Sequence, residues 1–189
     1  MSRVKRLFDL IFASMGLVLL AAPMGFIAII VKLTSEGPIL YWSDRVGIDN
    51  EIFRMPKFRT MKRDAPVVAT HLLQNAKRHL TPIGRFLRTT SLDELPQLYC
   101  ILRGELSFVG PRPALYNQDD LIALRTQYGV QRLVPGLTGW AQIHGRDELP
   151  VPAKVQFDAY YLENRSLWLD VKILAWTPLK VLLGEGVSH

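Results

Sequence analysis

Two adjacent carboxylates, Asp93 and Glu94, are the side chains of this sequence best suited to chemistry. They lie in the segment TSLDELPQL, and a carboxylate can act as a nucleophile, a general base or a metal ligand. Basic residues that suit phosphate groups occur in other segments. The ordinary alternative is a helix start, because Asp and Glu are common in first helical turns. The spacing alone leaves both interpretations open.

Two other segments carry basic candidates for phosphate binding. Lys57 and Arg59 are two residues apart in an extended segment, so on a strand they would face the same side. Arg112 lies between two prolines that stiffen its backbone, which favours a bidentate grip on phosphate. For both segments, exposed cations without a ligand are the alternative.

The segment PGLTGWAQIHGR, residues 135–146, concentrates glycine and small polar residues around Trp140. Glycine lets a backbone amide approach an anion or a nucleobase closely, so this segment is a candidate ligand site. A pair of turns in a loop is the alternative. Walker A, GxGxxG, CxxC and HExxH motifs do not occur in the sequence. Nucleic acid is not favoured as a partner, since the basic residues are not interleaved with aromatic residues.

The acidic pair is expected at the start of a helix that Gly104 ends. Ser91 and Glu94 match a capping box, whereas Asp93 as the N-cap would leave Pro96 in the first turn, where proline costs little. Both alternatives place the two carboxylates at a helix N-terminus, where the dipole favours negative charge. The apolar residues at helical spacing are Leu95, Leu98, Tyr99 and Leu102.

The remaining pattern predicts a hairpin and three further helices. Residues 39–46 and 52–61 read as two strands around Gly47–Asn50. Helices are expected over residues 119–128, 155–163 and 167–183. The last of these carries Trp168 and Trp176 on one face, which suits either a membrane interface or a buried core.

The N-terminal segment from Leu10 to Val31 contains 22 residues and no charge. About 20 apolar residues can span a bilayer as a helix. Pro23 lies near the middle of the segment and predicts a kink. A kinked spanning helix and a re-entrant helix with both ends cytoplasmic are both compatible with basic residues on both flanks. A cleaved signal peptide is not favoured, because the apolar run continues past Pro23.

The composition is that of one folded domain with anionic partners. The chain has 189 residues, of which 49% are hydrophobic and 21% charged, so disorder is not expected. The formal net charge of +6 favours phosphorylated ligands or an acidic membrane surface. With Cys100 as its one cysteine, the chain forms no internal disulfide, which fits a reducing compartment.

Six segments together resemble the small monotopic phosphoglycosyl transferases of the bacterial sugar transferase family. They occur in the order seen in that family and span nearly the whole chain. The length also resembles that of the minimal family members, which lack extra N-terminal membrane helices. The segments are KRLFDL, PKFRTM, TSLDELPQL, SFVGPRP, PGLTGWAQIHGR and FDAYYLENRSLWLD.

The resemblance implies transfer of a phospho-sugar from a UDP-sugar to polyprenyl (undecaprenyl) phosphate, with release of UMP. On this expectation Asp93 attacks the sugar-bearing phosphate and forms a covalent intermediate, and Glu94 assists the lipid phosphate in the second half of the reaction. Asp93 would also lie at a Mg²⁺ ion that offsets diphosphate charge. The residues expected to bind substrate phosphate are Arg88, Arg112, Lys57, Arg59 and Arg146.

The resemblance further implies an α+β fold that is mostly helical and monotopic. Its expected parts are a re-entrant membrane helix at residues 1–34, broken at Pro23, and a catalytic domain at residues 35–189. A small antiparallel hairpin and interfacial amphipathic helices belong to the second part. The expected location is the cytoplasmic leaflet of the bacterial inner membrane, with membrane lipids as partners and both termini in the cytoplasm. The implied role is the first membrane step of glycoconjugate synthesis.

Two positions depart from the family pattern, and two other functions fit the residues. Ala22 precedes Pro23 where the family has serine, and His144 stands where asparagine is expected. A membrane-bound nucleotide-sugar pyrophosphatase would use the acidic pair only for metal and water. A non-catalytic membrane scaffold would use the basic residues to dock anionic lipid. The motifs imply no particular sugar and no particular oligomeric state.

Overall fold

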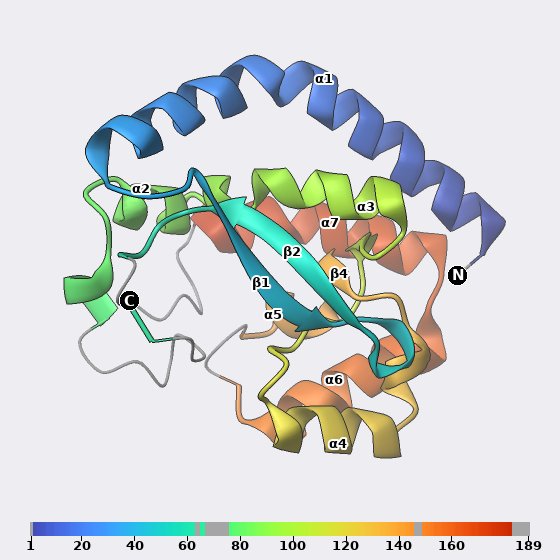
Figure 1. Cartoon of the computed structure of the whole chain (residues 1–189). Coiled ribbons are helices and arrows are strands. Elements are labelled where there is room, and N and C mark those ends of the chain that lie inside the picture. The colour runs from blue at the N-terminus through green and yellow to red at the C-terminus, as the bar shows by residue number, and fades with distance from the viewer. Residues whose placement is uncertain (1, 63–64, 67–75, 146–148, 183–189) are drawn as a thin grey trace.

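The computed structural model describes residues 2–62, 65–66, 76–145 and 149–182. The described residues form a mostly helical α+β structure with two small sheets, which confirms the α+β part of the predicted fold class (Figure 1). The elements in chain order are α1 (Arg3–Thr34), β1 (Leu40–Val46), η1 (Ile48–Asn50), β2 (Ile52–Phe58), η3 (Ala76–His79), α2 (Gly84–Thr89), η4 (Leu92–Gln97), α3 (Leu98–Arg103), β3 (Ser107–Val109), α4 (Asp119–Gln127), η5 (Val130–Arg132), β4 (Gly136–Thr138), α5 (Trp140–Ile143), α6 (Val151–Asn164) and α7 (Leu167–Leu182).

Helix α1 runs through 32 residues without interruption. The side chain of Ser2 caps its start by accepting a hydrogen bond from the backbone of Lys5. Pro23 lies inside the helix, where the sequence predicted a break. The structure instead has one continuous helix, which Figure 1 shows as an arch with both ends turned toward the rest of the molecule.

The two faces of α1 have different surroundings. On the inner face, Ala13 packs in a cluster with Leu98, and Val31 packs in a second cluster with Phe58. Among the described residues, α1 is the one helix long and apolar enough to cross a membrane. An exposed apolar face of this extent marks an interaction surface, and its length suits a membrane. The large apolar residues that α1 leaves exposed are Val4, Leu7, Ile11, Phe12, Met15, Val18, Leu19, Phe26, Ile29 and Leu33.

The predicted hairpin is confirmed. Strand β1 pairs with β2 in antiparallel register, with Tyr41 opposite Lys57. The turn places Asp49 and Asn50 at positive φ angles of 52° and 64°, a conformation that short polar side chains tolerate. Strand β2 ends at Phe58, three residues before the predicted limit at Met61.

A second, parallel pair of strands was not predicted from the sequence. Strand β3 pairs with β4, which lies in the glycine-rich segment. A Cβ atom on Gly136 would lie 2.0 Å from the amide nitrogen of Gly110, and one on Gly139 would lie 2.1 Å from the carbonyl oxygen of Gly110. These glycines therefore let two stretches of backbone approach each other in the structure.

Helices α4 and α6 lie on the side of the molecule opposite α1 (Figure 1). Arg125 of α4 donates hydrogen bonds from Nε and Nη2 to one carboxylate oxygen of Asp158 of α6, at 2.9 and 2.6 Å. The remaining guanidinium nitrogen, Nη1, donates to the backbone oxygen of Arg112 at 2.8 Å. This buried pair thus joins two helices and also fixes the segment that carries Arg112.

Helix α7 has one buried and one exposed apolar face. Leu169 and Ile173 are buried in the core, whereas Trp168 and Trp176 are exposed. The structure therefore combines the two alternatives predicted for this helix, core packing and an exposed apolar face with tryptophans.

The start of α7 is tied to the start of α1. The ammonium of Lys5 lies 2.7 Å from Oδ2 of Asp170, and the hydroxyl of Tyr161 donates to Oδ1 of Asp170 at 2.6 Å. Nearby on α1, the buried Asp9 accepts a hydrogen bond from the backbone nitrogen of Phe108 at 3.2 Å. These polar contacts attach the N-terminal end of the arch to the body of the protein.

Candidate active site

The acidic pair lies in the first turn of the 3-10 helix η4, which leads directly into α3. Ser91, before η4, adopts a left-handed conformation with φ of 57°, and its side chain makes no capping hydrogen bond. Ser91 is the N-cap residue, as one alternative predicted, but the side-chain hydrogen bond of a capping box is not formed. Asp93 as the N-cap is wrong, because the helix begins before it. The pair does lie at a helix start, and Gly104 ends α3 with φ of 85° as predicted.

Asp93 is 6% exposed and lies among other charged groups. Loss of solvation, and then the neighbouring charge of Glu94, raise the pKa of Asp93 to about 6, against the influence of cations nearby. Those cations are Lys57, Arg88 and Arg112. The structure thus brings five of the sequence-predicted site residues together from β2, α2, η4 and the segment after β3.

Arg88 is positioned by close packing of α2 on the chain that follows β2. A Cβ atom on Gly84 would lie 2.1 Å from the carbonyl oxygen of Thr60, so the first residue of α2 rests directly on this backbone. Arg88 is half-buried in the last turn of the same helix. A larger residue at Gly84 would push the helix away and carry Arg88 with it.

Lys57 is half-buried on β2 and faces the acidic pair. Burial lowers the pKa of Lys57 to about 8; the carboxylate of Asp93 acts to raise it and the guanidinium of Arg45 to lower it. The ammonium also lies 5.8 Å from the centre of the Tyr41 ring, within the range of a cation–π interaction.

Arg112 forms a direct ion pair with Glu94. The distance from Nη2 of Arg112 to Oε1 of Glu94 is 2.9 Å. The backbone around Arg112 is fixed from two directions: Arg125 donates to the oxygen of Arg112, and Arg45 donates to the oxygen of Pro113 at 3.2 Å. These contacts hold the segment so that the Arg112 side chain meets the acidic pair.

The structure does not bring Arg59 to this cluster. Because β2 ends at Phe58, Lys57 and Arg59 do not share a strand face as predicted. The guanidinium of Arg59 donates to the backbone oxygen and hydroxyl of Ser35, both at 2.7 Å, and to the backbone oxygen of Pro38. It therefore fixes the loop between α1 and β1. Arg146 lies outside the described residues.

Arg45 and Tyr41, which both lie on β1, were not predicted as site residues. Alternation along the strand places them on the same face as Ser43, and register places Tyr41 opposite Lys57. The predicted hairpin could have indicated them, because the strand that pairs with the Lys57 strand must place side chains next to Lys57. The thiol of Cys100 is buried, which raises its pKa to about 12 and makes it unsuited to nucleophilic chemistry.

The donor set around Asp93 fits a magnesium ion that substrate helps to bind. Among the described residues, no three His, Cys, Asp or Glu side chains gather at a metal-binding distance. Asp93 and Glu94 supply at most two carboxylates, and Glu94 already pairs with Arg112. Mg²⁺ is usually held by one or two carboxylates with water and substrate phosphates, so this set is sufficient for it.

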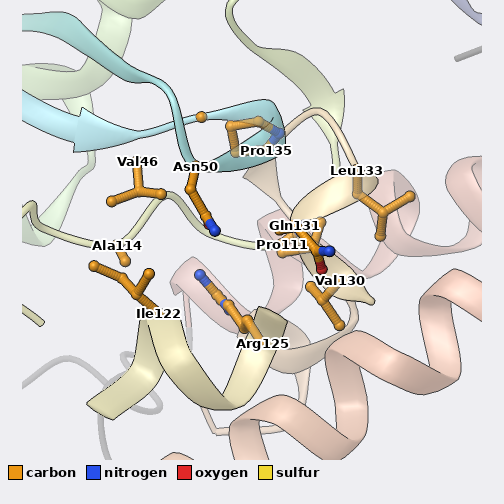
Figure 2. A pocket seen from close by; sticks show the side chains of 11 residues that line it. Val46, Asn50, Pro111, Ala114, Ile122, Arg125, Val130, Gln131, Leu133 and Pro135 are labelled. Atoms are coloured by element: carbon orange, nitrogen blue, oxygen red, sulfur yellow. The ribbon is translucent and has the colours of Figure 1, made fainter. Parts of the chain in front are cut away.

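A small pocket lies elsewhere, between the hairpin turn, α4 and η5 (Figure 2). Its volume of about 20 Å³ holds a single water molecule and no nucleotide sugar. Figure 2 shows Asn50, Arg125 and Gln131 among its lining side chains. The candidate active site is therefore the charged cluster around Asp93, which shares no residue with this pocket.

The cluster can support phosphoryl transfer. With a pKa of about 6, Asp93 is mostly ionised at neutral pH and can act as a nucleophile. Fixed cations stabilise the charge of a transferring phosphoryl group and of its leaving group. The exposed apolar face of α1 is long and apolar enough to suit a membrane.

Comparison with known proteins agrees with this chemistry. The family model for the bacterial sugar transferases matches residues 1–184. An uncharacterized sugar transferase of Bacillus subtilis (strain 168), EpsL, is 41% identical over 98% of this chain and 91% of its own length. The UDP-glucose:undecaprenyl-phosphate glucose-1-phosphate transferase of Escherichia coli (strain K12) is 40% identical over 97% of this chain.

The relatives differ in length. This chain spans 41% of the Escherichia coli protein. It also spans 44% of an Aeromonas hydrophila protein, which is 35% identical over 97% of this chain. That protein is named a UDP-N-acetylgalactosamine-undecaprenyl-phosphate N-acetylgalactosaminephosphotransferase. The chain thus matches nearly all of EpsL and less than half of the other two relatives.

Proposed function

This chain belongs to the bacterial sugar transferase family, and we propose that it transfers a phospho-sugar from a UDP-sugar to undecaprenyl (polyprenyl) phosphate. The products are a polyprenyl-diphosphate sugar and UMP. The names of relatives that act on undecaprenyl phosphate support this reaction. The observation that carries the proposal is the buried Asp93, gathered with Lys57, Arg88 and Arg112 in a protein whose helix α1 exposes a long apolar face.

In the first half of the reaction, a carboxylate oxygen of Asp93 attacks the phosphorus that carries the sugar. A new oxygen–phosphorus bond forms, the bond from this phosphorus to the bridging oxygen breaks, and UMP leaves with the bonding electrons. The cations that interact with the Asp93 carboxylate also stabilise the negative charge that moves onto UMP. They are Lys57, Arg88 and Arg112. The covalent step divides one difficult displacement into two.

In the second half, an oxygen of the lipid phosphate attacks the same phosphorus. The bond to Asp93 breaks and the carboxylate is restored. Glu94 accepts the proton when the lipid phosphate enters in its singly protonated form. The 2.9 Å contact with Arg112 orients Glu94 for this role and places a cation beside the incoming phosphate.

Magnesium fits the site as a cofactor. Asp93 would hold it, and when bound the ion would offset the negative charge of the donor diphosphate.

We further propose that α1 enters the cytoplasmic leaflet and returns, so that both termini remain in the cytoplasm. Support comes from its packing: the half with Ala13 and the half with Val31 both rest on the same protein body. A helix that crossed the bilayer would have to detach one of these halves. The exposed Trp168 and Trp176 of α7 suit the membrane interface. Labelling of an N-terminal tag only from the periplasmic side would contradict this topology.

The test of the reaction is intact-protein mass after incubation with UDP-sugars and Mg²⁺, without lipid acceptor. The expected result is a mass gain of one phospho-sugar in the wild type and none in Asp93→Asn, with membrane binding retained in both. Release of UMP without an adduct would favour the pyrophosphatase. Neither adduct nor UMP with any donor, in the presence or absence of polyprenyl phosphate, would favour the scaffold.

A further inference from the structure

Tyr41 contacts the lysine that faces the acidic pair. It lies directly opposite Lys57 in the β1–β2 register, and the Lys57 ammonium is 5.8 Å from the centre of its ring. Lys57 in turn is one of the cations with the largest influence on Asp93. The ring and the carboxylate therefore act on the same ammonium from two different elements, β1 and η4.

We propose that Tyr41 is a positioning residue, whose ring holds the Lys57 ammonium in place to bind a phosphate of the donor diphosphate. This inference rests on the proposed function of the site. Lysine has a flexible four-carbon side chain that loses much rotamer freedom when it is held in one place. A ring restricts that freedom by cation–π attraction and adds no acceptor oxygen, so the N–H donors that point away from the ring stay available for phosphate oxygens.

Tyr41 is too exposed to be a core residue, so its role can be tested without disturbing core packing. Tyr41 is 37% exposed, and it belongs to none of the hydrophobic core clusters of the described residues. A leucine at this position would keep the β1 backbone pairing and most of the buried apolar surface. Tyr41→Leu is therefore expected to fold, and its effect reports on the loss of the ring.

The opposite face of the hairpin supplies a matched control. Trp42 is 41% exposed, and the guanidinium of Arg54 lies 5.5 Å from the centre of its ring. Because strand side chains alternate, this second cation–π pair faces away from Tyr41 and Lys57. Arg54 is not among the charges with the largest influence on Asp93. Trp42→Leu removes the same kind of contact from the same strand without touching the site.

The experiment measures binding of inorganic pyrophosphate by titration calorimetry with Mg²⁺ present, together with the donor KM and kcat of adduct formation. Tyr41→Leu is expected to weaken pyrophosphate binding and raise the donor KM by roughly three- to tenfold, a loss between those of an exposed and a desolvated cation–π contact. Tyr41→Phe, which keeps the ring, should restore both values to within about twofold of the wild type, and Trp42→Leu should leave both within the same limit.

A double-mutant cycle tests whether Tyr41 acts through Lys57. In a Lys57→Met background, Tyr41→Leu is expected to cause no further loss of pyrophosphate affinity. A full further loss would show that the ring contacts the ligand directly and would overturn the positioning role. An equal loss in Trp42→Leu, or none in Tyr41→Leu, would overturn it as well.

Pyrophosphate binding and adduct formation test the role of Tyr41 and the proposed function separately. Pyrophosphate binding requires no transfer reaction, so the Tyr41 comparison stands even if no donor forms an adduct with the wild type, a result that would count against the proposed function alone. If the wild type forms the adduct and Tyr41→Leu matches it in both readouts, the function holds and the role of Tyr41 does not. A wild type that binds no pyrophosphate would also contradict the role, since Lys57 would then hold no phosphate.

Discussion

Two arginine–carboxylate pairs in this molecule have similar distances and different surroundings. Arg125 and Asp158 approach to 2.6 Å, and their side chains are 10% and 1% exposed. Arg112 and Glu94 approach to 2.9 Å, with exposures of 35% and 17%. The first pair is closed inside the fold between α4 and α6, whereas the second remains partly open to solvent beside Asp93.

The comparison shows that burial decides the role of an arginine–carboxylate pair: the buried pair serves stability, and the partly exposed pair is available for function. A buried pair whose partner is removed leaves an uncompensated charge, which is strongly destabilising. A partly open pair can exchange its partner for a ligand at little cost. The two pairs are also connected, because Arg125 donates to the backbone oxygen of Arg112 at 2.8 Å. The closed pair therefore holds the backbone from which the open pair extends.

The largest expected effect is a loss of activity, at Asp93 beside the partly exposed Arg112–Glu94 pair. Asp93→Asn should lower turnover at least ~1,000-fold, because the amide cannot form the phosphosugar bond. Its free energy of unfolding should not fall, since the change removes a buried charge beside Glu94. Turnover assays and thermal unfolding check the two parts. Retained turnover would remove Asp93 as the nucleophile.

The second effect is on stability, at the closed side. Arg125→Met leaves the carboxylate of Asp158 buried without its partner and should lower the free energy of unfolding by about 3–5 kcal/mol. The double variant Arg125→Met, Asp158→Leu removes both charges and should recover most of this loss. Denaturant unfolding of the two variants tests the difference. Equal destabilisation by both would mean that packing, and not the lone charge, sets the cost.

Glu94→Gln should show most directly that the Arg112–Glu94 pair serves activity and not stability. It removes the charge of the open pair, so the free energy of unfolding should change by less than about 1 kcal/mol. Transfer to the lipid phosphate should slow by about 100-fold, the lower range for lost acid–base assistance, while the adduct on Asp93 still forms. Time-resolved intact mass with and without polyprenyl phosphate measures both steps. Loss of adduct formation itself would place Glu94 in the first step.

The smallest effect is a dependence on pH. With the pKa of Asp93 at about 6, kcat/KM for adduct formation should fall about tenfold for each pH unit below 6, because only the carboxylate attacks. The folded-state pKa lies above the ordinary value of 3.8, so protonation favours the folded protein. Wild type should therefore lose stability relative to Asp93→Asn as pH rises from 3.8 to about 6, and no further above that. A rate that is flat from pH 5 to 7 would contradict this assignment.

The sequence predicted elements whose pattern is local. The hairpin and the helices α4, α6 and α7 carry their own periodicity and end signals, and the structure has all of them. The pairing of β3 with β4 was missed because three-residue strands show no alternation, and their partners lie far apart in the chain. The same limit applies to the glycine-rich segment, where the need for close backbone contact appears only once Gly110 is next to Gly136.

The motifs predicted most of the residues of the candidate site. Which of them lie together became clear only from the fold. Five of the expected residues gather: Asp93 and Glu94 lie in η4, Lys57 and Arg88 lie near the ends of β2 and α2, and Arg112 lies in the segment after β3. Arg59 does not, because β2 ends before it and the loop after α1 offers carbonyl groups for its guanidinium. Ser91 is the N-cap residue, but it has a left-handed conformation and its side chain makes no capping hydrogen bond, which the local pattern did not reveal.

The attachment of α1 at both ends has a consequence for the covalent chain. Lys5 binds Asp170 at the start of the arch, and Ser35 binds Arg59 just beyond its end. Gly37 follows, so a cut there would leave Ser35 with the first fragment and Arg59 with the second. The two pieces would also keep the apolar contacts along the inner face of α1. Expressed as two separate chains divided at Gly37, they are expected to assemble into one working protein.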